Sequence, residues 1–258
     1  MDLGICVPLE KAEEVLAARP DFIEEHIQNF LKPAEPESAC AKNLADAANS
    51  KVPVRAANCF LPGAMKCVGP EVDLAALERY AAAAFARAHA AGIQVLVFGS
   101  GAARKLPDGF PKSKATGQFI ALLKRLGPIA AANQVTIVVE PLNKGETNFI
   151  NSLAEGAETV ERAAHPNIRL LADLFHMLRD GEPAAEIARF GKWLAHVHLA
   201  EKEKRSAPGV KGDDFRPFFA ALKQAGYDRR MAVECGWTDR PKESILALET
   251  VRRQWKEA

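Results

Sequence analysis

Two glutamates, an aspartate and a histidine occupy the ends of four apolar runs in the second half of the chain. Glu140 follows "VTIVV", Asp173 follows "IRLLA", His198 lies in "LAHVHL" and Glu234 follows "MAV". A buried carboxylate costs several kcal/mol unless a metal, a cation or hydrogen bonds compensate it. Carboxylates and imidazole suit Mn²⁺, Mg²⁺, Co²⁺ or Zn²⁺, so the four residues together predict a site for one divalent metal ion.

Each of these residues has a simpler explanation when it is taken alone. A carboxylate at a strand end often caps a helix or anchors a loop, and His176 or His196 could be a hydrogen-bonded structural histidine. His196 and His198 are two residues apart, so both lie on the same side of a strand. The successive intervals along the series Glu140, Asp173, His198 and Glu234 are 33, 25 and 36 residues. Each interval is about one strand–helix unit, which favours a shared site built from four successive strands.

Short apolar segments alternate with longer amphipathic segments along the whole chain. Strands are predicted over 4–8, 94–99, 135–140, 168–173, 194–199 and 231–235, with two weaker candidates near 21–27 and 52–60. Helices are predicted over 73–92, 117–134 and 215–228, with Gly92 and Gly226 as stop signals. Such alternation is typical of parallel strands joined by crossover helices.

The predicted fold is therefore α/β: a (β/α)8 TIM barrel that forms a single domain over residues 1–258. A doubly wound open sheet is the alternative. No GxGxxG fingerprint follows an early strand, which argues against the dinucleotide-binding version of that sheet. In a barrel, the carboxyl ends of the strands meet at one mouth, where the four predicted ligands would converge.

Composition and charge narrow the classes of function. Hydrophobic residues make up 48% of the chain and charged residues 26%, as in ordinary globular proteins. A net charge of +1 gives no reason to expect a nucleic-acid partner or a membrane surface. No apolar stretch reaches the length of a membrane span, no signal peptide is visible, and the five cysteines include no CxxC pair. We expect a cytoplasmic protein with reduced thiols; whether it forms a homo-oligomer stays open.

From about Val135 to Trp237 the chain resembles the xylose isomerase-like barrel superfamily, specifically the sugar isomerase/epimerase branch that includes D-tagatose 3-epimerase and D-psicose 3-epimerase. The motifs that carry the resemblance are "EPLNKGET", "DLFHM", "HVH", "KRSAPG" and "MAVECGW". The resemblance implies three sets of site residues: Glu140, Asp173, His198 and Glu234 as metal ligands, Glu140 and Glu234 also as catalytic groups, and Glu146, His176 and Arg205 as substrate-binding groups.

In such enzymes a divalent metal, with Mn²⁺ the first choice over Mg²⁺, Co²⁺ and Zn²⁺, holds the ketose carbonyl and an adjacent hydroxyl. One glutamate removes a proton from one face of the substrate, and the other returns it to the opposite face. The resemblance therefore implies a metal-dependent isomerase or epimerase that acts on a small ketose or related keto-sugar through an enediolate. A dehydratase of a keto-cyclitol or a dehydroshikimate-type substrate is the alternative, because it shares the proton abstraction.

Other functions fit the sequence less well. Endonuclease IV, a nuclease of the same superfamily, uses three zinc ions and extra early histidines. Here the third and fourth strand ends read "AANCFLPG" and "VFGSGAAR", without histidine. A sugar-binding protein without activity would not need two acid/base glutamates. The Gly-rich segment 99–110 could cradle a phosphate, but we expect a simple mobile loop whose Arg104 and Lys105 are solvated surface charges.

Overall fold

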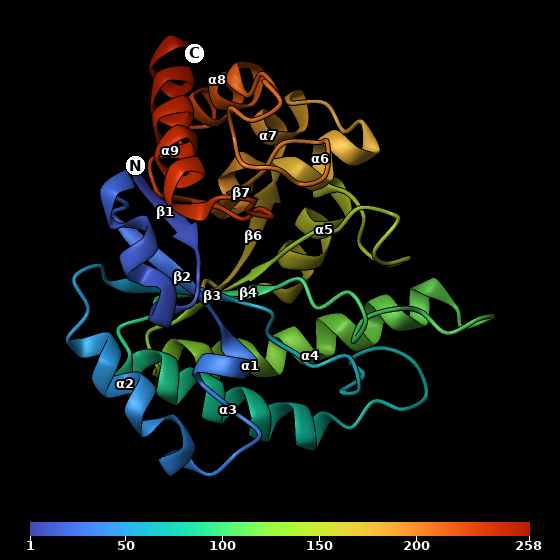
Figure 1. The fold of residues 1–258 in the computed structure, drawn as a ribbon. Coiled ribbons are helices and arrows are strands. Elements are labelled where there is room, and N and C mark those ends of the chain that lie inside the picture. Colours follow the sequence, from blue (N-terminus) through green and yellow to red (C-terminus); the bar gives the residue numbers. More distant parts are fainter.

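The computed structural model describes residues 1–258. In it, eight short apolar runs form parallel strands, and each strand pairs with the next one along the chain. The strands are β1 (Asp2–Cys6), β2 (Phe22–His26), β3 (Val54–Asn58), β4 (Val95–Phe98), β5 (Thr136–Val139), β6 (Ile168–Asp173), β7 (Leu194–Leu199) and β8 (Arg230–Val233). Because β1 also pairs with β8, the sheet closes into a barrel (Figure 1). The predicted barrel is confirmed, including its two weaker strands, and the open-sheet alternative is wrong.

Helices connect the strands and form the outer layer. The α-helices are α1 (Ile27–Phe30), α2 (Ala41–Ala48), α3 (Leu74–Ala90), α4 (Lys112–Ala132), α5 (Leu153–Ala163), α6 (Leu174–Asp180), α7 (Ala185–Phe190), α8 (Arg216–Gln224) and α9 (Arg240–Glu257), and the 3-10 helices are η1 (Leu9–Ala18), η2 (Glu37–Cys40) and η3 (Gly191–Trp193). Helices α3 and α8 match the prediction. Helix α4 begins before the predicted start at Gly117, because its first turns bury Ala115 and Phe119. None of these helices combines the length and the apolar character needed to cross a membrane.

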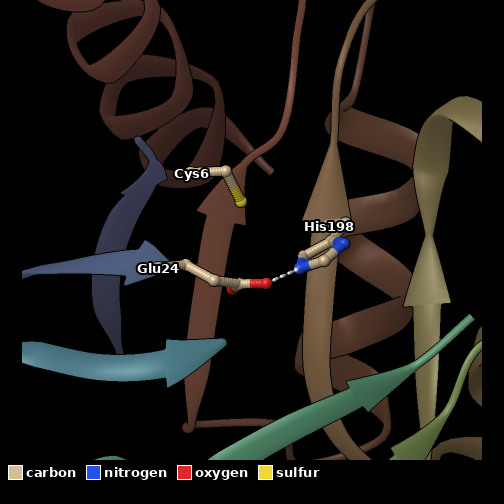
Figure 2. Close-up of side chains that lie close together, drawn as sticks. All are labelled: Cys6, Glu24 and His198. Atoms are coloured by element: carbon tan, nitrogen blue, oxygen red, sulfur yellow. Dashed lines mark hydrogen bonds and ion pairs between the residues drawn. The ribbon is translucent and has the colours of Figure 1, made fainter. Parts of the chain in front are cut away.

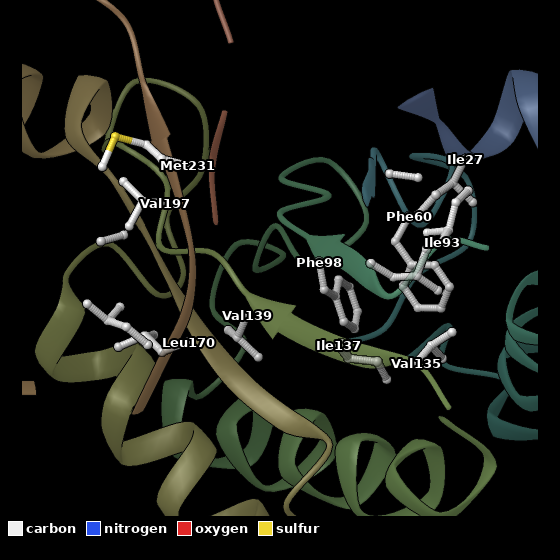
Figure 3. Close-up of a cluster of buried hydrophobic side chains, with 14 of the residues drawn as sticks. Ile27, Phe60, Ile93, Phe98, Val135, Ile137, Val139, Leu170, Val197 and Met231 are labelled. Atoms are coloured by element: carbon white, nitrogen blue, oxygen red, sulfur yellow. The ribbon is translucent and has the colours of Figure 1, made fainter. Parts of the chain in front are cut away.

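Two apolar clusters fill the molecule. The larger one lies between the strands and the surrounding helices, and Figure 3 shows part of it, with Phe98, Val139 and Val197 among its members. The smaller one contains Phe22, Ala56, Val95, Val97, Val138, Leu171, Ala195 and Ala232, with Cys6 packed against it. Since these residues come from all eight strands, the smaller cluster fills the interior of the barrel.

Side chains along each strand point alternately to the barrel interior and to the helices, and this alternation places the polar residues at the mouth of the barrel. Val138 and Leu171 belong to the interior cluster, so the residues two positions later, Glu140 and Asp173, also face the interior, one layer nearer the carboxyl ends of the strands. Strands β5 and β8 end at Val139 and Val233, one and two residues earlier than predicted, so Glu140 and Glu234 lie just beyond the last strand residue. After Glu140, Pro141 has no N–H with which to continue the ladder.

Candidate functional site

The four residues predicted as metal ligands converge at the mouth of the barrel. One ligand atom from each of Glu140, Asp173, His198 and Glu234 lies within 4.8 Å of the others. His198 Nδ1 is 3.5 Å from Glu140 Oε1 and 3.1 Å from Glu234 Oε2. One imidazole nitrogen therefore lies between the carboxylates of two different strand ends.

Asp173 combines the two roles that the sequence left open. Its Oδ1 caps helix α6 and accepts a hydrogen bond from the Phe175 N–H at 2.7 Å. Its Oδ2 faces the site, where it lies 3.4 Å from His176 Nε2. The pairing of β6 with β7 places Asp173 directly beside His198. Capping the helix thus orients the carboxylate and leaves one oxygen for the site.

The charges in this cluster shift the pKa values of its members. Burial raises the pKa of Glu140. Burial also acts to raise the pKa of Glu234, but the charges of His198 and Arg205 outweigh it and lower that pKa to about 2. Burial acts to lower the pKa of His198, whereas Glu24 and Glu234 hold it well above its usual value. The carboxylates around His198 therefore favour a positive charge at this position, and a bound cation would meet the same preference.

Two buried atoms of the cluster have no hydrogen-bond partner within the protein: Glu140 Oε1 and His198 Nδ1. Such groups are rare in folded proteins and call for an explanation. Three carboxylates and one imidazole form a donor set of oxygen and nitrogen that suits a divalent ion such as Mn²⁺, Co²⁺ or Zn²⁺. These residues fit the metal that the sequence predicts.

Gly99, at the end of β4, makes room for this arrangement. A Cβ atom at this position would lie 2.2 Å from Glu140 Oε2. Any side chain at this position would displace the Glu140 carboxylate, so the missing side chain is required by the site. The same carboxylate would repel a phosphate group at Gly99, which argues against the phosphate-cradle reading of the 99–110 loop.

The predicted substrate-binding residues line a cavity of about 270 Å³ above the four ligands. The cavity lining includes Glu140, Glu146, His176, Arg205 and Glu234, whereas Asp173 and His198 lie more deeply buried. Its volume lies just below the roughly 300–1,000 Å³ range of ligand pockets, so it suits a small molecule.

Asn143 joins two of these residues. Its Nδ2 donates to Glu146 Oε1 at 2.9 Å and lies 2.8 Å from His176 Nδ1. The Glu146 side chain is 43% exposed, whereas His176 is buried. Asn143 therefore holds a rim carboxylate and a deeper imidazole in one orientation, a role that we did not predict from "EPLNKGET".

Arg205 reaches the centre of the site from the loop after β7. Its Nη2 lies 3.3 Å from Asp173 Oδ2 and hydrogen-bonds Glu234 Oε2, and its guanidinium stacks 4.7 Å from the centre of the Phe175 ring. The loop is held by Glu201, a fully buried carboxylate. Glu201 accepts backbone N–H groups of Gly209, Lys211, Gly212 and Asp213.

The expectation that Arg104 is a solvated surface charge is wrong. Arg104 is fully buried, and its Nη2 donates to the backbone carbonyl of Glu140 at 2.6 Å. Burial lowers the pKa of Arg104 to about 10. The arginine therefore anchors the turn that carries Glu140, whereas Lys105 is exposed as expected.

Glu24 is a further residue that sequence analysis missed. Its oxygens lie 2.8 Å from His196 Nε2 and 2.9 Å from His198 Nε2. Cys6, Glu24 and His198 also form a close group (Figure 2). Burial and nearby carboxylates raise the pKa of the Cys6 thiol well above its usual value. Because Phe22 belongs to the interior cluster, alternation along β2 places Glu24 inside the barrel as well, but the sequence alone does not show which face of this strand is the interior one.

Comparisons with known proteins agree with the fold. L-ribulose 3-epimerase from Methylomonas sp. (strain DH-1) is 35% identical over 109 residues, which are 42% of this chain and 38% of that protein. D-psicose 3-epimerase from Clostridium cellulolyticum H10, solved with D-tagatose, has a TM-score of 0.85 at 18% identity, and the match covers 99% of both chains. The IolI protein, solved with a zinc atom, has a TM-score of 0.76 at 18% identity, covering 100% of this chain and 97% of that one.

The matches to curated relatives are partial, and the chain spans between 38% and 57% of their lengths. A family model covers much more of the chain. The model described as "Xylose isomerase-like TIM barrel" matches residues 16–254, which include every strand of the barrel except β1 and all four predicted metal ligands. The chain therefore belongs to the xylose isomerase-like TIM barrel family.

Proposed function

We propose that this protein is a divalent-metal-dependent sugar isomerase or epimerase that acts on a ketose or a related keto-sugar. One observation carries the proposal. The carboxylates of Glu140 and Glu234 approach the same cavity from different strand ends and lie 3.5 and 3.1 Å from a single nitrogen, Nδ1 of His198. A site with two acid/base groups around one small cavity suits the transfer of a proton between two faces of a substrate.

The metal would be held by Glu140, Asp173, His198 and Glu234. When bound, it would supply Lewis-acid polarisation of the substrate carbonyl. One of the two glutamates removes the proton from the carbon beside the carbonyl, and the electron pair delocalises into the carbonyl to give an enediolate. The other glutamate returns a proton, and delivery to the opposite face inverts that carbon.

Three further residues would hold the substrate in a fixed position relative to these two carboxylates. His176, Glu146 and Arg205 line the cavity and offer both hydrogen-bond donors and acceptors to sugar hydroxyls. Asn143 holds His176 and Glu146 in place, and the Phe175 ring stacks against Arg205. Such positioning keeps the reacting carbon between the two bases.

The names of similar proteins support this class of reaction. A relative that is 35% identical over part of its length is an L-ribulose 3-epimerase, and a structural neighbour is a D-psicose 3-epimerase. For the metal, the support is the IolI structure with its zinc atom, together with the two unpartnered ligand atoms in this site.

Exchange of substrate hydrogen with solvent tests the proposed function. Metal-loaded protein should incorporate deuterium at one carbon of its substrate when it is incubated with ketoses and keto-cyclitols in D₂O. Mass spectrometry and NMR would identify both the substrate and the labelled carbon. A product lighter by one water would instead identify a dehydratase, and no exchange with any member of the panel would contradict the proposal.

Metal content is a second expected result. Purified protein should carry about one divalent ion per chain, because the structure brings one set of four ligands together. Elemental analysis measures the stoichiometry. A protein without metal that added Mn²⁺ or Co²⁺ fails to activate would contradict the metal site, and three zinc ions per chain would favour a nuclease.

Gly99→Ala should weaken metal binding without unfolding the protein. The new methyl group would collide with Glu140 Oε2, which must move away from the other ligands. Gly117→Ala is the matched control, because a Cβ at Gly117 meets nothing within 4 Å. We expect a higher metal dissociation constant for the first variant only, while the control gains roughly 0.5–1 kcal/mol of stability in its helix. Equal affinities in both variants would show that Gly99 does not shape the site.

A further inference from the structure

Glu24 lies inside the barrel, beneath the proposed metal site. It is 1% exposed and projects from β2 toward His198 on β7 (Figure 2). His196 comes from the same strand as His198. Its two carboxylate oxygens have separate partners. Oε2 lies 2.8 Å from His196 Nε2, and Oε1 lies 2.9 Å from His198 Nε2. One carboxylate therefore joins both histidines of the HVH motif.

These contacts fix the protons of both rings. An ionised carboxylate only accepts hydrogen bonds, so both Nε2 atoms must be the donors. A ring that keeps its proton on Nε2 can offer only Nδ1 to a metal. In His198, Nδ1 is the buried atom without a hydrogen-bond partner that faces Glu140 and Glu234.

His196 has a different place in this arrangement. Its ring lies edge-on to His198 at 4.9 Å, its Nδ1 is also buried without a hydrogen-bond partner, and it is not one of the four clustered ligands. Its donation to Glu24 occupies the second oxygen and prevents the carboxylate from turning. The Glu24 carboxylate is thereby held in the orientation in which its other oxygen accepts the hydrogen bond from His198 Nε2.

We propose that Glu24 is the positioning residue of the metal centre: it holds the Nε2 proton of His198 and so presents Nδ1 to the metal, while His196 locks the carboxylate in place. This inference rests on the metal site proposed above. Carboxylates that bind metal-ligating histidines in this way raise metal affinity by roughly 10–100-fold.

The test compares Glu24 with its neighbour Glu25. Glu25 is also buried and binds only the backbone N–H groups of Leu9 and His26, so Glu25→Gln is a control that changes a buried carboxylate one residue away without touching either histidine. We expect Glu24→Leu, which removes both acceptors, to raise the dissociation constant for Zn²⁺ and Mn²⁺ by about 10–100-fold. Glu25→Gln should stay close to wild type. Equal constants in the two variants, measured by chelator competition, would overturn the proposal.

A rescue experiment separates positioning from a general loss of stability. In Glu24→Gln, the amide has one acceptor and one donor, so it cannot accept from both histidines. Either ring can accept from the amide N–H by moving its proton to Nδ1, so the amide oxygen is no longer reserved for His198. Adding His196→Glu supplies an ionised side chain that only accepts, so it takes the amide N–H and reserves the amide oxygen for His198. We expect the single variant to bind metal more weakly than wild type and the double variant to recover most of the loss. A double variant that binds no better than the single one would contradict the locking role of His196.

Nitrogen-15 NMR of labelled histidines gives a readout that needs no activity. In wild-type protein, with and without Zn²⁺, the Nε2 of His198 should carry a proton, and in Glu24→Leu this Nε2–H signal should weaken or shift. An Nε2 without a proton in the wild type would overturn the inference even if metal binds. If the wild type shows the Nε2–H signal but binds no metal, the proposed function fails while the hydrogen-bond pattern stands.

Discussion

Replacing either Glu140 or Glu234 by glutamine is expected to lower kcat by roughly 10²–10⁴-fold, the usual contribution of a general acid or base. Glutamine keeps the size of the side chain and one acceptor oxygen, but it cannot take up the substrate proton. Substrate binding should change less than kcat, because Glu146, His176 and Arg205 keep their places around the cavity. Steady-state kinetics on the substrate identified in D₂O would measure both effects.

Metal occupancy must be measured in each of these variants, because a weakened metal site would also lower the rate. Glu158→Gln is a matched control, since Glu158 is an exposed residue of α5 outside the cavity. Metal-loaded variants of Glu140 or Glu234 with rates near wild type would rule out the catalytic assignment. A two-base epimerase makes a finer prediction. A variant that lacks one base should still exchange hydrogen with D₂O from the face served by the other, without inverting the carbon.

The fold could be predicted from the sequence because each strand has its own apolar pattern. The runs "VTIVV" and "IRLLA" are short, apolar and rich in β-branched or aliphatic residues, and they recur at the spacing of a strand–helix unit. The same spacing brought Glu140 and Asp173 to one mouth, where the structure places their ligand atoms together with those of His198 and Glu234. Regular repetition makes both the topology and the shared face predictable.

Residues whose role depends on packing between distant segments were not predictable in this way. Arg104 lies in a Gly-rich loop beside a lysine, where a charged side chain is usually solvated, yet it contacts the Glu140 carbonyl 36 residues further along the chain. Glu24 is followed by another glutamate, and nothing in "FIEEH" tells which of the two faces the interior until the strand boundaries are known. Buried charges of this kind depend on partners that only the tertiary fold supplies.

The two histidines of the HVH motif should differ most clearly in metal binding. His198→Ala removes the only nitrogen ligand of the proposed site, so we expect the protein to lose its metal on dialysis. The loss of affinity should exceed the roughly 10–100-fold that a supporting residue contributes. His196→Ala should keep its metal on dialysis and lose only a smaller part of the affinity, because Glu24 loses the partner that locks it but keeps its hydrogen bond with His198 Nε2 at 2.9 Å.

Elemental analysis after dialysis, together with chelator competition, would measure this difference, and the pair of variants supplies its own control. Both substitutions remove a fully buried imidazole from β7, and both leave a cavity of similar size inside the barrel. Loss of stability alone would therefore affect the two variants alike. Only the ligand role distinguishes them, because Nδ1 of His198 faces Glu140 and Glu234 while His196 contacts Glu24. Equal metal loss in the two variants would show that His196 is also required for the metal site, and metal retained in both would remove His198 from the ligand set.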